Sequence, residues 1–549
     1  MIRCLARPAR TLSALAIVAA LGVLVGGSAH AVNTNFIFMS RLDSYTGYND
    51  VWGYRDPNTG NEYAILGTRT GTSIVNVTDP FNPYQTGFIA GPTSIWRDMH
   101  TYQGRAYVVS EGTDSLGNGS GLQIISLANP EAPFLIRKKH SFTAHTLWID
   151  EAAGVAYCNG TNSLGIGFRA YNLVAAPDNP PLQQEFGGTY IHDIWVGGGL
   201  AYTADINNGG QMRILDVSAL PSGTTINQLG IATYLGGSTH NTWPHPDGIH
   251  VLTTDEQTNG TVRVWDVSDQ AAPIEVAQFN NSPNTSVHNV YMKADTAYCS
   301  WYAAGIRAFD LSDPLTPTFI GRYDTSPATT GFSGCWSVYP LLPSGVILCA
   351  DISEGLITVV YSDEIGTISG TVTRAEDATP IVGATVSVPG FYNKSVQTDG
   401  SGNYSFELPG GAQSVEVAFT GYITDTQAVS IVDATTTTHD VALTNAATGV
   451  GGSGVGVAAL SLSDAKPNPT RGLATVDLAL PRAADVKVEV FDLAGRRVKT
   501  LAEGALPAGL HRVNWDGADS NGRAVAAGTY LYRLETSGQT RTAKVTVVR

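Results

Sequence analysis

The chain has 549 residues, 60 of them glycine, a formal net charge of −15 and only 14% charged residues. This length exceeds a single domain, so two to four domains are expected. The acidic balance argues against nucleic acid and anionic membranes as partners. After the first 31 residues no run of 18 apolar residues occurs, which predicts a mature chain without a membrane span. The glycine-rich composition is typical of an all-β chain with many turns.

Residues 1–31 have the pattern of a secretory signal peptide. Three arginines precede an apolar run at 12–25, and Ala29-His30-Ala31 forms an A-x-A cleavage site. An uncleaved anchor is the alternative, but the well-placed small residues favour cleavage. Removal leaves 518 residues (549 − 31) with a net charge of −18 (−15 − 3). The sequence therefore predicts an exported, soluble protein.

Residues 35–362 contain a unit that recurs with a period close to 48 residues. In its clearest copy, 287–324, four short runs rich in β-branched and aromatic residues are separated by Gly, Asp and Pro, at 288–292, 296–302, 305–311 and 318–323. Such runs indicate strands rather than helices. A four-stranded unit at a fixed period predicts a propeller blade.

Seven copies align on the first residue of the first strand, with separations of 48, 48, 47, 48, 48 and 48 residues. These ring positions are Asn49, Arg97, His145, His192, His240, His288 and Trp336. A bulky residue follows three places later in each copy: Trp52, His100, Trp148, Trp195, Trp243, Tyr291 and Tyr339. One blade cannot bury two apolar faces alone, whereas seven arranged radially can. We therefore expect a seven-bladed β-propeller over residues 32–362.

The last copy lacks a fourth strand after 356–361, because a new domain begins close behind it. The segment 35–42, ahead of the first copy, has the alternation of a fourth strand. We expect it to pair with 356–361 and close the ring, which removes an exposed sheet edge.

Four cysteines remain after cleavage. Cys158, Cys299 and Cys349 share one position in the second strand of their copies, which favours small buried side chains over reactive ones. Cys335 and Cys349 lie on neighbouring strands, and the sequence leaves open whether they form a diagonal disulfide, for which the offset is poor.

Several motifs in the repeats resemble a known family. YNDVWGY at 48–54, STHNTW at 238–243, VHNVYM at 287–292 and VTDP at 77–80 resemble the LVIVD-repeat propellers of secreted bacterial proteins, in particular the choice-of-anchor B family. This resemblance implies a propeller in a cell-surface setting, without implying an activity.

Residues 365–444 read as short strands separated by Gly, Pro and Asp turns. G-A-T-V at 383–386 and T-D-G-S-G-N-Y at 398–404 resemble the carboxypeptidase-regulatory-like β-sandwich. Asp399 and Asn403 could help to bind calcium, but a tight turn explains both residues better. A flexible Gly/Ala/Ser/Val linker is expected at 445–461.

Residues 462–549 are expected to form a second, Ig-like β-sandwich. P-N-P at 467–469, F-D-L-A-G-R-R at 491–497, W-D-G at 515–517 and G-T-Y-L-Y-R-L at 528–534 resemble the Ig-like domain of flagellar hook-capping proteins and of type IX secreted cargo. A signal peptide favours the type IX cargo over the hook-capping proteins, so the resemblance implies secretion and surface-attachment machinery as partners. The loop 516–522 partly imitates a calcium loop, but Ala518 stands where a ligand is required, so a turn is expected.

The ring positions are the candidate site, since signatures of nucleophile elbows, zincins, Walker loops and Rossmann folds are absent. Each is followed by a small or polar residue: Asp50, Asp98, Thr146, Asp193, Asn241, Asn289 and Ser337. In one interpretation these residues are struts that tie each inner strand to a neighbour by hydrogen bonds. In the other, His145, His192, His240 and His288 bind a divalent metal such as zinc, copper or nickel, and Arg97 binds a carboxylate or sulfate. The strut interpretation is favoured.

Two function classes follow. The first is a non-enzymatic, surface-attached protein whose propeller is a binding or display module, with an extracellular protein or glycan as partner. The second is an extracellular metal-dependent hydrolase or lyase that uses the histidines. The sequence shows no carboxylate ligands at a matched spacing, which favours the first class, and it requires no cofactor.

The exported protein should begin at Val32, because cleavage follows Ala31. Intact-mass measurement of the exported protein checks this. A mass that still includes residues 1–31 would contradict the prediction.

Overall fold

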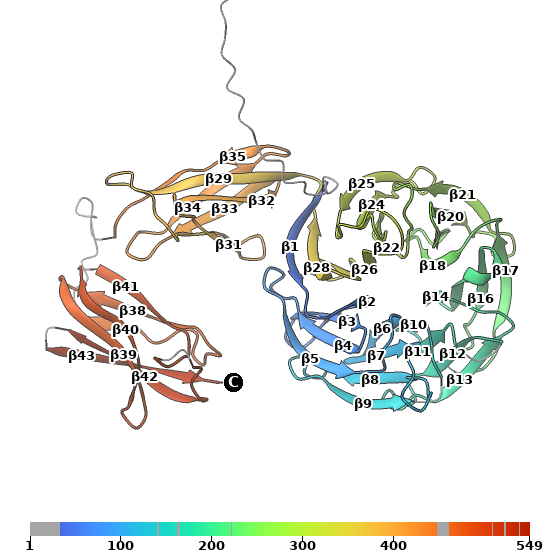
Figure 1. Ribbon diagram of the computed structural model, residues 1–549, viewed down its shortest axis with the longest axis horizontal. Coiled ribbons are helices and arrows are strands. Elements are labelled where there is room, and N and C mark those ends of the chain that lie inside the picture. The colour runs from blue at the N-terminus through green and yellow to red at the C-terminus, as the bar shows by residue number, and fades with distance from the viewer. Residues whose placement is uncertain are drawn as a thin grey trace, which may run out of the picture.

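The computed structural model describes residues 33–139, 142–161, 165–220, 222–446, 460–507, 509–520, 523–536 and 538–548. The expected signal peptide and most of the expected linker lie outside these ranges. Apart from the short 3₁₀ helix η1 (Ile206–Asn208), the described elements are strands. They form a β-propeller followed by two β-sandwiches, so the predicted fold class is confirmed (Figure 1).

The propeller consists of seven four-stranded antiparallel sheets arranged around a channel (Figure 1). Blades 1 to 3 are formed by β2 (Tyr48–Arg55), β3 (Glu62–Thr68), β4 (Gly71–Asn76), β5 (Tyr84–Ala90); β6 (Arg97–Tyr102), β7 (Arg105–Ser110), β8 (Leu122–Ser126), β9 (Phe134–Lys139); and β10 (Thr146–Asp150), β11 (Val155–Asn159), β12 (Ile166–Asn172), β13 (Leu182–Gly187).

Blades 4 to 7 continue the same order from the channel outward. They are formed by β14 (Asp193–Gly197), β15 (Leu200–Ala204), β16 (Gln211–Asp216), β17 (Asn227–Thr233); β18 (Thr239–Pro244), β19 (His250–Asp255), β20 (Val262–Asp266), β21 (Ile274–Phe279); β22 (Val290–Lys293), β23 (Thr296–Ser300), β24 (Ile306–Asp310), β25 (Thr318–Tyr323); and β26 (Cys335–Tyr339), β27 (Ile347–Asp351), β28 (Gly355–Tyr361), β1 (Phe36–Leu42).

The recurrent turn before the outer strand is held by a side chain. The carboxylates of Asp79, Asp269 and Asp313 each accept a hydrogen bond from the backbone N–H two residues later, at 3.0, 3.1 and 3.0 Å. Aspartate stabilises turns in this way by taking the place of a backbone acceptor. The repeated turn motif is thus a local signal for the chain reversal.

Ring closure occurs as the sequence predicts. Strand β1 pairs antiparallel with β28, from Phe36 opposite Tyr361 to Leu42 opposite Leu356, with a bulge between Phe38 and Ser40 (Figure 1). The hydroxyl of Ser40 donates to the Pro80 carbonyl of blade 1 at 2.6 Å, which links the closed blade to its neighbour. The first and last strands of the propeller therefore complete one sheet.

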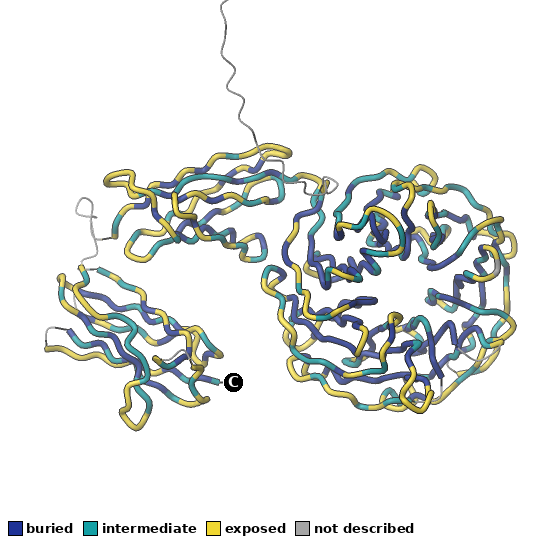
Figure 2. The backbone as a smooth tube through the Cα atoms, viewed as in Figure 1, coloured by how far each residue is buried: buried dark blue, intermediate teal, exposed yellow. Residues whose placement is uncertain are grey.

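The core lies between the blades, where the second and third strands are buried and the outer strands face solvent (Figure 2). Cys158, Cys299 and Cys349 are fully buried, as expected for small core residues. Cys335 and Cys349 are free thiols whose Sγ atoms lie 2.6 Å apart. Burial and the neighbouring thiol raise the pKa of Cys349 well above its usual range, which disfavours a reactive thiolate.

The first sandwich packs two sheets face to face, β32-β29-β35 with β36 also on β29, and β31-β30-β33-β34. Its strands are β29 (Ile365–Arg374), β30 (Thr385–Val388), β31 (Lys394–Gln397), β32 (Asn403–Pro409), β33 (Gly411–Ala418), β34 (Asp425–Ile431), β35 (Thr436–Thr438) and β36 (Val441–Leu443). Asp399 accepts hydrogen bonds from the N–H groups of Ser401 and Asn403, both at 2.8 Å, and so forms the expected tight turn.

The first sandwich contacts the rim of the propeller. The rings of Phe81 and Phe391 are 6.0 Å apart, and the Lys394 ammonium lies 4.0 Å above the Phe81 ring. The Tyr392 hydroxyl donates to the Ser344 carbonyl at 2.8 Å. These contacts join the sandwich to blades 1 and 7, away from the channel.

The second sandwich contains the sheets β37-β38-β41 and β40-β39-β42-β43 around the fully buried Trp515. Its strands are β37 (Ser461–Leu462), β38 (Ala474–Leu480), β39 (Ala484–Asp492), β40 (Arg497–Leu506), β41 (Gly509–Trp515), β42 (Gly528–Thr536) and β43 (Gln539–Val547). In the 516–522 loop Asp516 accepts from the Ala518 N–H at 3.1 Å and pairs with Lys499 at 2.8 Å, as in a turn. The last two residues of this loop lie outside the described residues.

Deletion of residues 33–43 should lower the free energy of unfolding of the propeller by several kcal/mol, because β28 loses its partner and becomes an open edge. Thermal or urea denaturation measures the loss. Removal of residues 447–549 is the control and should leave the propeller transition in place. An unchanged melting temperature after the first deletion would show that closure does not stabilise the ring.

Candidate functional site at the channel mouth

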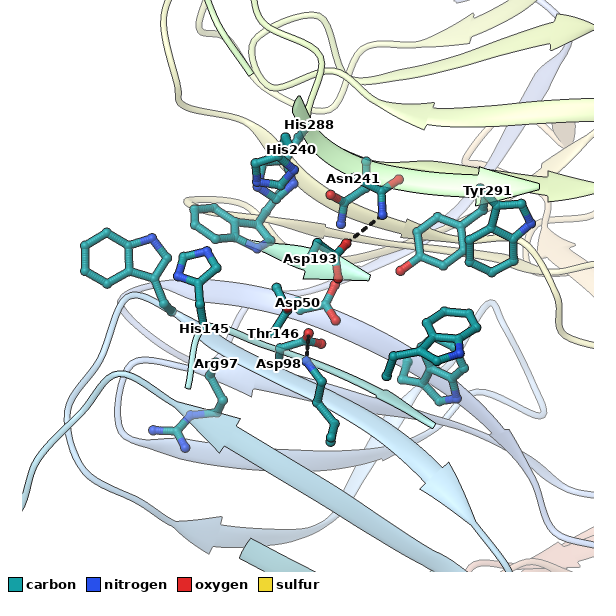
Figure 3. A pocket seen from close by; sticks show the side chains of 17 residues that line it. Asp50, Arg97, Asp98, His145, Thr146, Asp193, His240, Asn241, His288 and Tyr291 are labelled. Carbon is teal, nitrogen blue, oxygen red and sulfur yellow. Dashed lines mark hydrogen bonds between the residues drawn. The ribbon is translucent and has the colours of Figure 1, made fainter. Parts of the chain in front are cut away.

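The inner strands begin at one end of the channel, where the ring positions Arg97, His145, His240, His288 and Trp336 line a common cavity (Figure 3). The rings at five of the positions form a continuous row from blade 3 to blade 7, with neighbouring rings tilted by 44° to 53° to one another. The ring centroids are 4.2 Å apart between His145 and His192, 4.2 Å between His192 and His240, 4.1 Å between His240 and His288, and 4.7 Å between His288 and Trp336. The equal spacing follows from the repeat period, since neighbouring blades present the same position.

Asn49 and Arg97 complete the ring but act within the scaffold. Arg97 is buried, and its guanidinium donates to the Thr68 carbonyl at 3.1 Å, the Pro92 carbonyl at 2.6 Å and the Gln123 side chain at 3.3 Å. Burial lowers its pKa to about 10. These bonds tie blade 1 to blade 2, and they use three of the five N–H donors of the guanidinium.

Asn49 also links blade 1 to the start of blade 2. Its Nδ2 donates to the Ile95 carbonyl at 2.5 Å, in the segment that leads into blade 2.

Hydrogen bonds determine which nitrogen of two histidines carries the proton. Nδ1 of His192 lies 3.1 Å from the carbonyl oxygen of His240, and Nδ1 of His145 lies 2.6 Å from a carboxylate oxygen of Glu111. Both oxygens accept, so Nδ1 bears a hydrogen in each ring, and the neutral form of each ring has its lone pair on Nε2. Nδ1 of His240 and of His288 makes no hydrogen bond of normal geometry.

Burial favours the neutral form of His192, His240 and His288. The pKa of His192 lies well below its usual range because of desolvation and, secondarily, the neighbouring imidazoles. Desolvation also lowers the pKa of His288 well below that range, with the charge of His240 acting in the same direction. For His240 desolvation lowers the pKa to about 4, although the charge of Glu256 opposes it. Neutral imidazoles can accept a proton or bind a metal ion.

Two carboxylates that the sequence analysis did not identify lie next to the histidines. Glu111 directly follows β7 and pairs with His145, while Glu256 directly follows β19 and has Oε2 3.7 Å from Nε2 of His240. The Tyr302 hydroxyl donates to the other Glu256 oxygen at 2.5 Å. Both glutamates occupy the residue after the second strand of a blade. Aligning that position in the repeats, and not only the first strand, could have found them.

A second layer of polar side chains lies one residue deeper and links the blades (Figure 3). A carboxylate oxygen of Asp98 accepts the Leu147 N–H of blade 3 at 2.7 Å, and the Asn241 side-chain oxygen accepts the Val290 N–H of blade 6 at 3.0 Å. The Thr146 hydroxyl donates to the His192 carbonyl at 2.7 Å. These bonds link the inner strands of neighbouring blades.

Three carboxyl groups in this layer are buried together. Desolvation raises the pKa of both Asp50 and Asp98, and the charge of Asp50 raises that of Asp98 further. Desolvation also raises the pKa of Asp193 to about 6, against the hydrogen bond from Asn241 at 2.8 Å. Burial therefore favours the protonated form of all three carboxyl groups.

The bulky series of the repeats fills the channel below these layers. Trp52 lies 3.8 Å from His100 and 4.9 Å from Tyr339, and Trp243 lies 4.6 Å from Tyr291 and 5.3 Å from Trp148, all between ring centroids. Burial lowers the pKa of His100 to about 3, so this ring is neutral as well. The aromatic side chains close the channel and leave a shallow mouth.

The cavity left at the mouth is small. Its volume is about 40 Å³, and its lining includes Asp50, Asp98, His145, Asp193, His240 and His288. One water needs roughly 10–15 Å³, whereas sites for small organic ligands measure roughly 300–1,000 Å³. The mouth can therefore hold a few waters or one ion, but not a sugar or a peptide.

Three family models match parts of the chain. The LVIVD repeat matches residues 188–226, the carboxypeptidase regulatory-like domain matches 367–444, and the FlgD Ig-like domain matches 468–539. The chain therefore contains an LVIVD-repeat propeller followed by two sandwich domains of these types, which are typical of proteins outside the cell.

No curated protein matches the sequence. Among solved structures, the chain titled "Structure of U3-55K" aligns at 9% identity with a TM-score of 0.42, covering 60% of this chain and 98% of that one. Within the described ranges, no helix is long and apolar enough to span a bilayer.

His240 should make the propeller less stable in acid. Its pKa is about 4 in the folded state, where Glu256, His145 and Asn289 face the imidazole, and about 6.5 in the unfolded chain. At pH values between these two pKa values, only the unfolded state binds the proton. The free energy of unfolding therefore decreases as the pH is lowered. The pKa difference corresponds to roughly 3 kcal/mol. When the pH is lowered from 7 to 4, the free energy of unfolding of His240→Gln should increase by this amount relative to that of wild type. Urea denaturation with a chelator present measures the difference.

Asp193→Asn is the matched control with the opposite sign. The pKa of Asp193 is raised to about 6, so the folded state binds its proton first and wild type gains stability as pH falls through 6. The asparagine variant should therefore lose stability relative to wild type in acid. Parallel curves for all three proteins would contradict both assignments.

Proposed function

We propose that this protein is exported and attached to the outer cell surface, where the mouth face of the propeller binds an extracellular protein. The observation that carries the proposal is the 40 Å³ cavity at the mouth, which excludes the substrate of a hydrolase or lyase from the histidines. Recognition must then use the surface around the mouth. The two sandwiches hold the propeller away from the point of attachment.

Exposed apolar side chains surround the mouth. Ile95 and Trp96 are 44% and 37% exposed, and the Trp96 ring lies 6.0 Å from His145. Phe332 is 52% exposed and packs on Tyr302, which packs on His288. Large apolar side chains on a rigid rim are typical of protein interfaces. The described residues at the mouth form a cavity of about 40 Å³, too small to enclose a sugar ring, which favours a protein over a glycan.

The terminal segments support export and attachment. The chain begins with a signal-peptide pattern, and the FlgD Ig-like match at 468–539 covers the domain that resembles type IX cargo tails. The LVIVD match and the motifs at 48–54 and 287–292 support membership of the choice-of-anchor B family. In this proposal the last domain engages the secretion and surface-attachment machinery.

The double variant Trp96→Ala/Phe332→Ala should weaken partner binding at least about tenfold, because aromatic anchors dominate interface energies. Peptide and glycan arrays probed with residues 32–549 provide the measurement. The matched control is Tyr84→Ala/Phe134→Ala, which removes exposed rings from the outer strands β5 and β9. Binding confined to the glycan array, or equal losses in both double variants, would contradict the proposal.

A chain ended at residue 445 should fold its propeller but fail to reach the surface of the native host. The expected linker, 445–461, follows the first sandwich, so the cut leaves the propeller and its contacts with that sandwich in place. Surface proteolysis or antibody labelling of intact cells reports the location. Delivery equal to that of the full chain would refute the targeting role of residues 462–549.

A further inference from the structure

Three histidines from successive blades converge at the mouth. One ring nitrogen from each of His145, His192 and His240 lies within 4.8 Å of the other two. His145 and His240 belong to blades 3 and 5, with blade 4 between them, so the side chains turn toward a common point. The cavity of about 40 Å³ is lined by two of them, His145 and His240, and has room for one ion.

The hydrogen bonds prepare these rings for a metal. Nδ1 of His145 and His192 is held by Glu111 and by the His240 carbonyl, which leaves both Nε2 lone pairs available. Histidines that bind metals show this arrangement, in which a carboxylate or carbonyl on the second nitrogen orients the ring and increases its basicity. Glu256, with Oε2 3.7 Å from Nε2 of His240, adds a negative charge next to the third ring.

We propose that His145, His192 and His240 bind one Zn²⁺ ion that joins blades 3, 4 and 5. Neutral imidazole nitrogens favour zinc and its neighbours in the first transition series over calcium and magnesium. Three ligands at Zn–N distances of about 2.1 Å in a tetrahedron lie roughly 3.4 Å apart, so small side-chain rotations close the site. Glu256, whose Oε2 lies 3.7 Å from Nε2 of His240, supplies the fourth ligand in this proposal. Because the cavity admits no substrate, the ion has a structural role.

Two other groups among the described residues offer three ligand atoms each. In one, His245 contacts the Leu311 carbonyl and Asp247 at 3.1 Å each, and Asp247 also accepts from His250 at 2.7 Å. Those atoms already satisfy one another. The other group combines His240, Glu256 and His288 and shares His240 with the proposed site. A test must therefore distinguish His145 from His288.

Metal analysis of the full exported chain provides the test. Wild type stripped with a chelator should take up one Zn²⁺ per chain with a Kd below about 1 µM, and the ion should raise the melting temperature. His192→Gln should weaken binding by at least about 100-fold, and Glu111→Gln by about 10- to 100-fold. His250→Gln is the control and should bind like wild type. Absence of stoichiometric zinc in wild type, or zinc lost only in His250→Gln, would overturn the proposal.

The choice between the overlapping groups depends on a further pair of variants. His145→Gln should weaken zinc binding as much as His192→Gln, whereas His288→Gln should leave it within about threefold of wild type. The reverse order would overturn the assignment. If a variant fails to fold, the visible absorption spectrum of the wild-type chain loaded with Co²⁺ provides the test instead. Intense visible absorption bands of tetrahedral Co²⁺ are expected, and a weak octahedral spectrum would overturn the site.

Discussion

Pairing of β1 with β28 is the contact on which the rest of the propeller depends. Each blade buries its two faces against its neighbours, so an open ring would leave two faces and one sheet edge in solvent. The strand at 36–42 closes this gap by pairing with 356–361, and Ser40 links the closed blade to blade 1. Closure brings the starts of seven inner strands to one mouth. Only then do residues 48 positions apart in the sequence become neighbours.

Inside the closed ring, the channel is divided into layers with different chemistry. Aromatic side chains fill its depth, a layer that includes Asp50, Asp98 and Asp193 lies above them, and the imidazoles lie at the mouth. Desolvation acts in opposite directions on the two polar layers, because it raises the pKa of carboxyl groups and lowers that of histidines. Both layers are thereby driven toward their neutral forms. A closed ring can keep such groups buried because neighbouring blades satisfy many of them with hydrogen bonds.

The small mouth also relates the two proposals to each other. A cavity that admits only an ion leaves partner recognition to the exposed rim at Ile95, Trp96 and Phe332. An ion that joins blades 3 to 5 would hold the segments behind part of that rim. The two proposals remain separable, because one concerns exposed side chains and the other concerns buried nitrogens.

The sequence by itself determined the number of blades, the strand order within each blade and the closing strand, because these follow from local alternation and a fixed period. It also identified His145, His192, His240 and His288 as one series. Tertiary structure alone decided what the series can do. Glu111 and Glu256 come from other strand ends, Arg97 turned out to be occupied by scaffold carbonyls, and the aromatic plug reduced the cavity to about 40 Å³. Such properties depend on side-chain directions and on packing between blades, which a linear repeat does not record.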